Sequence, residues 1–401
     1  MLHSFAVGLG MALTFFVVCA SLYVIGFAVC GIYKRPYSAP CGRDTRFLVF
    51  VPAHNEGKGI QATLASLQRA DYPRDRVRII VIADNCTDGT AGEARACGVE
   101  VWARDDASNP GKGQALTWAF QKVNFTFDLA AIVDADTEVD PSFFLYMDRA
   151  YAACVRRGRR DVALQGRYLF RRVSRAASWF EQFTIASKAA ENSFTYRPRT
   201  ALGMANLIQG NGFCVSRTAL FTAPFDAVSI VEDAEYAVTL ALNDIPVVHV
   251  DEARVISRMT QRPKDAVSQR LRWASGTVAL LFHSVPRLLR GAVRQRRWKL
   301  AEMAVMLLFT SRLILVYATL AAITLLFLAR PFPIENLLVL LLAGTIALQA
   351  FYLYLVFRKA DSDPVPFQTI AFMPLYFGYL GAMQVGAVLG LKRKQWSRTA
   401  R

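Results

Sequence analysis

The segment from residue 5 to residue 32 contains no charged side chain and is apolar along almost its whole length. About 20 consecutive apolar residues are enough for a helix to cross the hydrocarbon core of a bilayer, so this segment is long enough to do so. A cleaved signal peptide is the alternative, but no basic n-region precedes the run, the run is too long, and no A-x-A site follows it. We therefore expect residues 1–33 to form an N-terminal transmembrane helix.

Three further apolar runs lie towards the C-terminal end, at about residues 303–329, 336–357 and 366–391. Arg312 interrupts the first run, and a charge at that depth needs an internal or interfacial partner. The last run contains Pro374 and several glycines, so a membrane span and a re-entrant or interfacial segment both stay open for it. The sequence predicts an integral membrane protein with one soluble domain. Its parts are an N-terminal transmembrane helix (1–33), the soluble domain (42–276), an interfacial amphipathic region (277–300), C-terminal transmembrane helices (301–392) and a basic tail (393–401).

The formal net charge is +16, and much of the basic excess lies beside the predicted spans, at Lys34 and Arg35 and between residues 287 and 299. Because basic residues are retained on the cytoplasmic side, we expect a multi-pass protein of the cell (inner) membrane with a cytoplasmic soluble domain. Three full crossings after that domain would place the basic residues 392–394 outside, against the same rule. Anionic membrane lipids are the expected partners of the basic stretches. No nucleic-acid-binding motif is present, so no nucleic-acid partner is expected.

The soluble domain alternates short apolar runs with helical patterns. Strands are predicted at residues 46–53, 77–84, 99–104 and 129–133, with helices at 58–70, 90–97 and 111–123 between them. This alternation is typical of an α/β fold with a parallel sheet and right-handed crossovers. Ligands bind such sheets at the carboxyl ends of the strands, and the polar stretches HNEGKG, DNCTDG and DADTEVD all follow strands. One edge of the sheet is therefore expected to carry a binding site.

The stretch DADTEVD places two carboxylates, Asp134 and Asp136, at a strand end. Oxygen ligands of this kind suit Mg²⁺ or Mn²⁺, which would also hold substrate phosphates; an ordinary acidic loop is the alternative. Asp84 ends another strand and could accept hydrogen bonds from a ribose or base. Lys112 lies on a glycine-rich helix entry that suits a phosphate, although a solvated lysine explains it nearly as well.

Two further groups of residues are candidates for the same site. Three acids, Glu232, Asp233 and Glu235, lie at a predicted helix start, where they either favour the helix dipole or include a general base. The i, i+3 and i+4 spacing of Gln269, Arg272 and Trp273 puts them on one helix face, where an indole and a guanidinium suit a sugar, a base or a phosphate. A membrane-surface amphipathic helix is the alternative there.

In order along the chain, VPAHNE, ADNCTDGT, NPGKGQAL, DAD, LQGNGFCVSR, VEDAEY and QRLRW resemble the family 2 glycosyltransferases of the GT-A fold. The resemblance is greatest to the membrane-embedded branch that includes cellulose, chitin and hyaluronan synthases, and it covers residues 45–276. It implies that Ala53, Glu56, Asp84, Lys112 and Asp134 bind the donor and that Asp136 binds Mg²⁺ or Mn²⁺. It also implies that Asp233 is the catalytic base and that Gln269, Arg272 and Trp273 bracket the donor diphosphate and the acceptor. The ADNCTD stretch, where the resemblance implies uridine contacts, departs from the commoner DDGS form.

The resemblance implies an inverting, metal-dependent transfer of a hexose from a nucleoside-diphosphate sugar, with UDP expected, to a lipid-linked or membrane-associated acceptor. Glycolipid, exopolysaccharide or cell-envelope biosynthesis would be its setting. A processive polysaccharide synthase that exports its product and a catalytically silent sugar-nucleotide-binding subunit are the alternatives. At most four candidate spans are present, and few of their side chains could hydrogen-bond a polymer, which favours single transfer.

Overall fold

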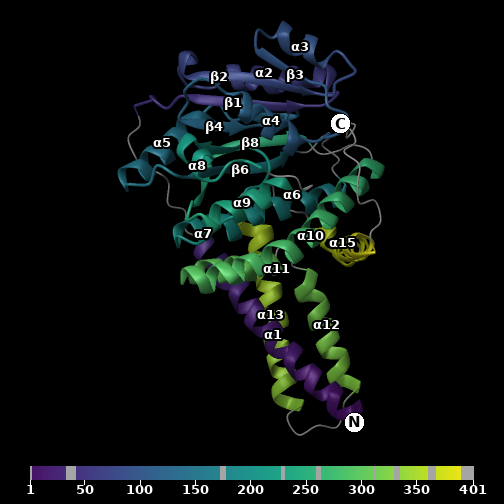
Figure 1. The fold of residues 1–401 in the computed structure, drawn as a ribbon. Helices are drawn as coiled ribbons and strands as arrows, with labels where there is room; N and C mark the ends of the chain where they lie inside the picture. The colour runs from purple at the N-terminus through teal and green to yellow at the C-terminus, as the bar shows by residue number, and fades with distance from the viewer. Residues whose placement is uncertain are drawn as a thin grey trace.

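The computed structural model describes residues 2–32, 42–171, 178–226, 231–258, 263–309, 313–328, 335–359 and 367–389. The molecule has a globular head, which contains the sheet, and a projecting helical stem (Figure 1). The stem consists of α1 (Leu2–Gly31), α12 (Leu313–Leu328) and α13 (Glu335–Lys359). Among the described residues, Ser4–Gly31 and Leu337–Arg358 are long and apolar enough to cross a membrane by length and composition, and the apolar part of α12 is shorter.

In the part of the chain that the structure describes, eight strands form one mixed sheet in the order β3-β2-β1-β4-β7-β6-β8-β5. The first four strands along the chain are parallel, as predicted: β1 (Phe47–Ala53), β2 (Val77–Asp84), β3 (Glu100–Arg104) and β4 (Leu129–Ile132). The rest of the sheet changes direction, because β7 (Phe213–Ser216) runs antiparallel to β4 and to β6 (Ala163–Arg171). The sheet is completed by β8 (Val247–Arg258), parallel to β6, and by the antiparallel β5 (Thr137–Val139).

The alternation of side chains along β1 explains why this sheet is covered on both faces. Leu48 and Phe50 belong to one apolar core, and Phe47, Val49 and Val51 belong to the core on the other face. Such uninterrupted apolar runs are typical of strands buried on both sides. The predicted helices between the parallel strands are present as α2 (Ile60–Gln68), α3 (Thr90–Ala96) and α4 (Lys112–Lys122).

The remaining helices of the head lie mostly between the sheet and the stem (Figure 1). They are α5 (Phe143–Arg156), α6 (Trp179–Glu191), a π-helix (Asn192–Tyr196), α7 (Arg197–Ala201), α8 (Arg217–Thr222), α9 (Glu232–Leu242) and the long α10 (Pro263–Gln295). A capping box at Ser178, whose hydroxyl accepts from the Glu181 amide, begins α6. The end of α1 is fixed to the head because Arg197 donates a 3.1 Å hydrogen bond to the carbonyl of Gly31.

The apolar run predicted at 303–329 is divided between two helices. The first, α11 (Trp298–Leu308), lies across the top of the stem, and the chain then turns down into α12 (Figure 1). Arg312 lies outside the described residues. In the last apolar run, a short α14 (Phe367–Ile370) precedes α15 (Met373–Val388). Figure 1 shows α15 nearly end-on, so it lies across the stem helices, and it packs against α10.

Candidate active site

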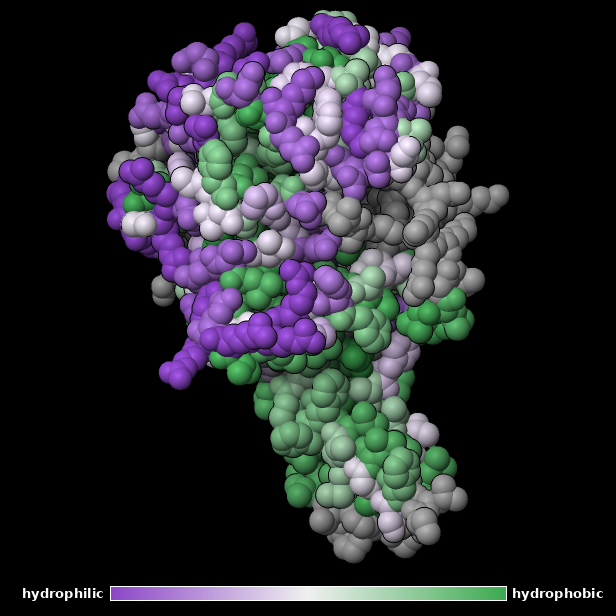
Figure 2. Space-filling model, in the orientation of Figure 1, coloured by the Kyte–Doolittle hydropathy of each residue, from purple (hydrophilic) through white to green (hydrophobic). Residues whose placement is uncertain are grey.

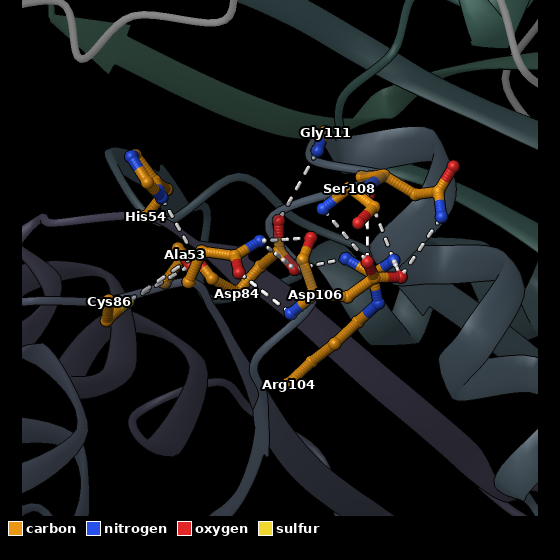
Figure 3. A network of polar contacts seen from close by, with 10 residues as sticks. Ala53, His54, Asp84, Cys86, Arg104, Asp106, Ser108 and Gly111 are labelled. Atoms are coloured by element: carbon orange, nitrogen blue, oxygen red, sulfur yellow. Dashed lines mark hydrogen bonds and ion pairs between the residues drawn. The ribbon is translucent and has the colours of Figure 1, made fainter.

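The polar loops that follow β1 and β2 lie side by side at the carboxyl edge of the sheet, as the sequence predicts. The register of the two parallel strands places Ala53 beside Ala83. The side chain of His54 lies 2.8 Å from the backbone carbonyl of Asp84 (Figure 3), and the side-chain oxygen of Asn55 accepts a 2.8 Å hydrogen bond from the Thr87 amide. Glu56 follows directly in the same loop. Hydrogen bonds within the protein thus hold together the loop residues that the sequence predicts to bind the donor nucleotide.

Asp84 has a partner that the sequence did not reveal. Its carboxylate is only 1% exposed and forms a 2.5 Å ion pair with Arg104, which is itself buried (Figure 3). The amide of Gly111 also donates to this carboxylate, at 3.4 Å, and Arg104 reaches Asp106 at 2.8 Å. Asp84 therefore ties β2 to the loop that leads into Lys112, and its buried carboxylate is paired with Arg104.

Lys112 joins two of the predicted acidic clusters. Its ammonium group contacts the carboxylate of Asp134 and the carbonyl of Gly210, and it lies 4.0 Å from the carboxylate of Glu232. Burial lowers the pKa of Lys112, but the Asp134 and Glu232 carboxylates outweigh burial, so the net effect is a raised pKa. Lys112 is therefore a positively charged group inside the site, which excludes the alternative of a solvated loop lysine.

The turn Gln209–Gly212 directly precedes β7 and contacts both the end of β4 and the start of α9. The buried side chain of Asn211 accepts a 3.1 Å hydrogen bond from the amide of Asp134 and donates to the Thr137 hydroxyl at 2.7 Å. Gly210 has φ of +75°, and a Cβ on it would lie 2.8 Å from an Asp233 carboxylate oxygen. Only glycine allows both the left-handed backbone and this close approach. No role for Asn211 was predicted from the sequence, although the glycines on either side of it in LQGNGFCVSR indicate a turn.

Glu232 and Asp233 form an acidic pair in the first turn of α9, close to Lys112. Burial and the neighbouring Asp233 raise the pKa of Glu232 to about 8, and burial raises the pKa of Asp233 as well. The Glu232 side chain is 13% exposed. Raised pKa values suit a carboxylate that has to accept a proton near neutral pH. The helix dipole favours acids in the first turn of α9. Burial of the two carboxylates explains their raised pKa values.

Asp136 lies beside Asp134 and is partly exposed, with the Thr137 hydroxyl donating to it at 3.1 Å. Within the described part of the chain, no group of three or more His, Cys, Asp or Glu side chains could hold a metal ion by itself. The carboxylate of Asp136, beside that of Asp134, fits Mg²⁺ or Mn²⁺, since these ions are commonly held by one or two carboxylates together with substrate phosphates and water.

Gln269, Arg272 and Trp273 belong to α10, as the predicted helix requires, but their side chains lie outside the described residues.

A mixed α/β sheet with acidic strand ends, a buried lysine and an acidic helix start along one edge is consistent with a glycosyltransferase of the GT-A fold. The family model of the glycosyltransferase-like family 2 matches residues 45–276, and the chain belongs to this family. The predicted fold class and enzyme class are thereby confirmed.

Individual relatives are more distant. A probable glycosyltransferase from Bacillus subtilis, YdaM, is 30% identical over 105 residues, so the chain spans only 24% of the length of this curated relative. The solved mannosyltransferase PcManGT from Pyrobaculum calidifontis, in complex with GDP-Man and Mn²⁺, has a TM-score of 0.59 at 18% identity. That match covers 96% of this chain and 99% of PcManGT, and it shows a shared fold. Glucosyl-3-phosphoglycerate synthase from Mycobacterium tuberculosis is also similar, with a TM-score of 0.37, 21% identity, and coverage of 58% of this chain and 77% of the synthase.

Proposed function

We propose that this enzyme transfers one hexose, with inversion, from a nucleoside-diphosphate sugar to a hydroxyl group of a lipid-linked or membrane-associated acceptor. UDP is the expected nucleotide, and the setting is glycolipid, exopolysaccharide or cell-envelope biosynthesis in the membrane-embedded branch of the family. The observation that carries the proposal is the position of Lys112 between Asp134 and Glu232. Lys112 therefore bridges Asp134, at the end of β4, and Glu232, in the acidic pair of α9.

Each residue of the site then has a chemical role. Asp233 takes the proton from the acceptor hydroxyl, whose oxygen attacks the anomeric carbon on the face opposite the diphosphate. Lys112 stabilises the negative charge that develops on the departing diphosphate. Asp136 would hold Mg²⁺ or Mn²⁺, whose charge would neutralise the same oxygens; PcManGT was solved with Mn²⁺. The remaining donor contacts are assigned to Ala53, Glu56, Gln269, Arg272 and Trp273, whereas the buried Asp84 would support these loops through its ion pair with Arg104.

The surface of α10 supports a membrane-associated acceptor. One stripe of this helix is apolar and exposed, with Phe282 81% and Val293 80% exposed, and Pro286 and Leu289 continue it at helical spacing. The adjacent stripe is basic and consists of His283, Arg287, Arg290 and Arg294. An apolar stripe flanked by basic residues is typical of a helix that lies in the membrane interface. Residues 277–300 are therefore proposed to lie in the plane of the cytoplasmic membrane surface.

The basic border of the head continues beyond α10. Asp244 contacts two arginines. Arg159 donates a 2.9 Å hydrogen bond to its backbone carbonyl, and Arg297 pairs with its carboxylate. The basic stretch at 156–160 therefore lies close to the turn between α10 and α11. Figure 2 shows hydrophilic residues along the lower border of the head and a largely hydrophobic stem below it. This border suits anionic lipid head groups and supports a cytoplasmic head above the membrane.

The test is a transfer assay with purified, reconstituted enzyme, a panel of labelled UDP- and GDP-sugars, and membrane lipid extract as acceptor. The expected product is one sugar heavier than its acceptor by mass spectrometry. Asp233→Asn should abolish transfer and leave metal-dependent donor binding within about a few-fold of wild type, because only proton removal is lost. Substantial turnover in this variant would move the base elsewhere. A ladder of long products would instead identify a processive synthase.

A further inference from the structure

Helix α15 lies at the boundary between the head and the stem. Figure 1 shows it nearly end-on, at the level of α10 and α11, whereas α1, α12 and α13 run down the stem. The hydroxyl of Tyr317, near the upper end of α12, donates a 3.1 Å hydrogen bond to the carbonyl of Phe377. A Cβ on Gly381 would overlap the same hydroxyl, so the two helices are in close contact where they cross. Helix α15 therefore crosses the stem at its top and does not run along it.

Helix α6 of the head holds α15 in this position. Trp179 of α6 stacks on Phe372, the residue before α15, with 5.7 Å between the ring centroids and 7° between the ring planes. Phe183 of α6 lies 5.1 Å from the ring of Tyr376, which is only 4% exposed. Aromatic pairs of this kind add a directional attraction to the burial of their surface. One face of α15 is therefore covered by α6, and the helix also packs against α10.

The exposed face of α15 is apolar from one end of the helix to the other. The spacing of three and four residues places its members on one side of a helix, and they are Leu375, Gly378, Ala382, Val385 and Leu389. Leu375 is 62% exposed, and Leu389, directly after the helix, is 72% exposed. These two residues are 14 positions apart, which corresponds to about 21 Å along a helix. A continuous apolar surface of this length indicates contact with a membrane.

The position of this apolar stripe agrees with such a contact. Where Figure 1 places α15, Figure 2 shows a hydrophobic projection at the lower right border of the head, level with the top of the stem. A helix in the membrane interface usually has a polar face of its own towards water. Helix α15 contains no charged residue and needs no such face, because α6 and α10 pack against it from the head.

We propose that α15 lies in the plane of the cytoplasmic membrane interface, with its apolar stripe towards the lipid chains, and that α1, α12 and α13 are the crossings. With the N-terminus outside, three crossings return the chain to the cytoplasmic side before α15 begins. The basic residues 392–394, which lie outside the described residues, would then follow on the cytoplasmic side, where basic residues are retained. This membrane path goes beyond the proposed function and does not depend on which sugar or acceptor is used.

The first test measures depth along the apolar stripe of α15. Single cysteines replace Leu375, Ala382 or Leu389 in the full chain, with the native cysteines replaced, and carry a bimane fluorophore in phosphatidylcholine–phosphatidylglycerol vesicles. Lipids with a nitroxide at a shallow or a deep chain position quench the fluorophore. All three positions should report the same depth, about 5–10 Å below the head groups. A steady change in depth of about 21 Å would show a fourth crossing, and a deepest position at residue 382 would show a re-entrant segment. Either result would overturn the proposal.

A matched pair of positions on α13 is the control. Leu340 and Tyr354 are also 14 positions apart, and they are 69% and 54% exposed. Because α13 runs along the stem, their depths should differ by up to about 21 Å in the same vesicles. Thermal unfolding of each labelled variant beside its cysteine-free parent shows whether the fold is kept.

The second test needs no cysteine. In bacterial cells, green fluorescent protein fused after Arg401 should fluoresce, because it folds in the cytoplasm, and alkaline phosphatase fused there should be inactive, because it folds only outside. Active phosphatase with dark fluorescent protein would overturn the three-crossing path. Sugar transfer by the unmodified chain is measured separately. Failure of transfer with every donor would overturn the proposed function, whereas the depth and fusion results would still decide the position of α15.

Discussion

Arg199 on α7 and Glu302 on α11 form a buried ion pair, with hydrogen bonds of 2.7 and 2.5 Å between the guanidinium and the carboxylate. Arg199 is 1% exposed, and it also donates to the hydroxyl of Tyr23 on α1 at 3.0 Å. Tyr23 in turn donates to Glu302 at 2.5 Å. Three segments far apart in sequence therefore meet at one charged contact, which joins the catalytic head to the helices at the top of the stem.

Arg199→Met should destabilise the protein by about 3–5 kcal/mol, because it leaves the Glu302 carboxylate buried without its charged partner. Thermal unfolding of the purified protein in detergent measures the effect. The double variant Arg199→Met/Glu302→Leu should recover much of the loss, since it removes both charges. Equal destabilisation in the single and double variants would show that lost packing, and not the unpaired charge, is responsible.

Glu232→Gln should stabilise the metal-free protein increasingly as the pH rises. The pKa of Glu232 is raised from 4.5 to about 8, so the folded protein holds a proton in that range which the unfolded chain releases. Stability is therefore lost as pH rises from about 4.5 to about 8. The melting temperature of the variant relative to wild type should increase from pH 5 to pH 8 in EDTA. Glu235→Gln changes the same charge in the same turn and is the control; a constant difference for Glu232→Gln would contradict the raised pKa.

Asp136→Ala should reduce transfer by about a hundredfold or more, because several kcal/mol of charge stabilisation depend on the divalent cation. EDTA should stop the wild-type reaction, and Mg²⁺ or Mn²⁺ should restore it. Asp75→Ala, which removes a largely exposed carboxylate outside the site, should behave as wild type. Full activity of Asp136→Ala in the same titration would remove this residue from the metal site.

Asn211→Ala should weaken the apparent affinity for the cation by about 10–100-fold while leaving the fold intact, because Asn211 holds the Asp134 amide and orients the turn that presents Asp136. A titration of activity with Mn²⁺ measures the change. Asn109→Ala, in the loop before Lys112, is the matched amide control. An unaltered cation dependence would show that Asn211 serves only to join the segment after β4 to β5 and β8.

A cysteine placed at Lys58, on the exposed loop after β1, should resist membrane-impermeant thiol reagents in intact cells. A cysteine at Ser4, at the opposite end of the molecule, should be labelled, since the basic flanks place the N-terminus outside. Both are made in a variant whose native cysteines are replaced. Labelling of residue 58 in intact cells would reverse the proposed topology.

The parallel half of the sheet could be predicted because its strands are uninterrupted apolar runs that end in polar loops. Lys112 and Asp134 were predicted for the same site for that reason. The Asp84–Arg104 pair could not be predicted, because it depends on the register that sets Asp84 opposite Arg104 on neighbouring strands. Local pattern indicates that both strands exist but does not fix which residues face each other.

The second half of the sheet shows a different limit. Strand β6 pairs with β7 and β8, which come later in the chain, and a change in strand direction leaves no local mark in an apolar run. The role of Asn211 was missed for the same reason, since its partners Asp134, Thr137 and Ser257 come from distant segments. Burial of Lys112 was likewise invisible in the sequence, because it depends on the tertiary position of Gly210 and Glu232.

The hydrogen bond from Arg197 to the end of α1 also sets an order of events during synthesis. Gly31 and Arg197 are 166 residues apart, so the ribosome needs on the order of 8–33 seconds to reach the partner of a helix that is already complete. During that interval the last turn of α1 has no docking surface. The nascent chain would therefore keep its head undocked until α7 emerges, and translation pauses between these points would lengthen its exposure to chaperones and proteases.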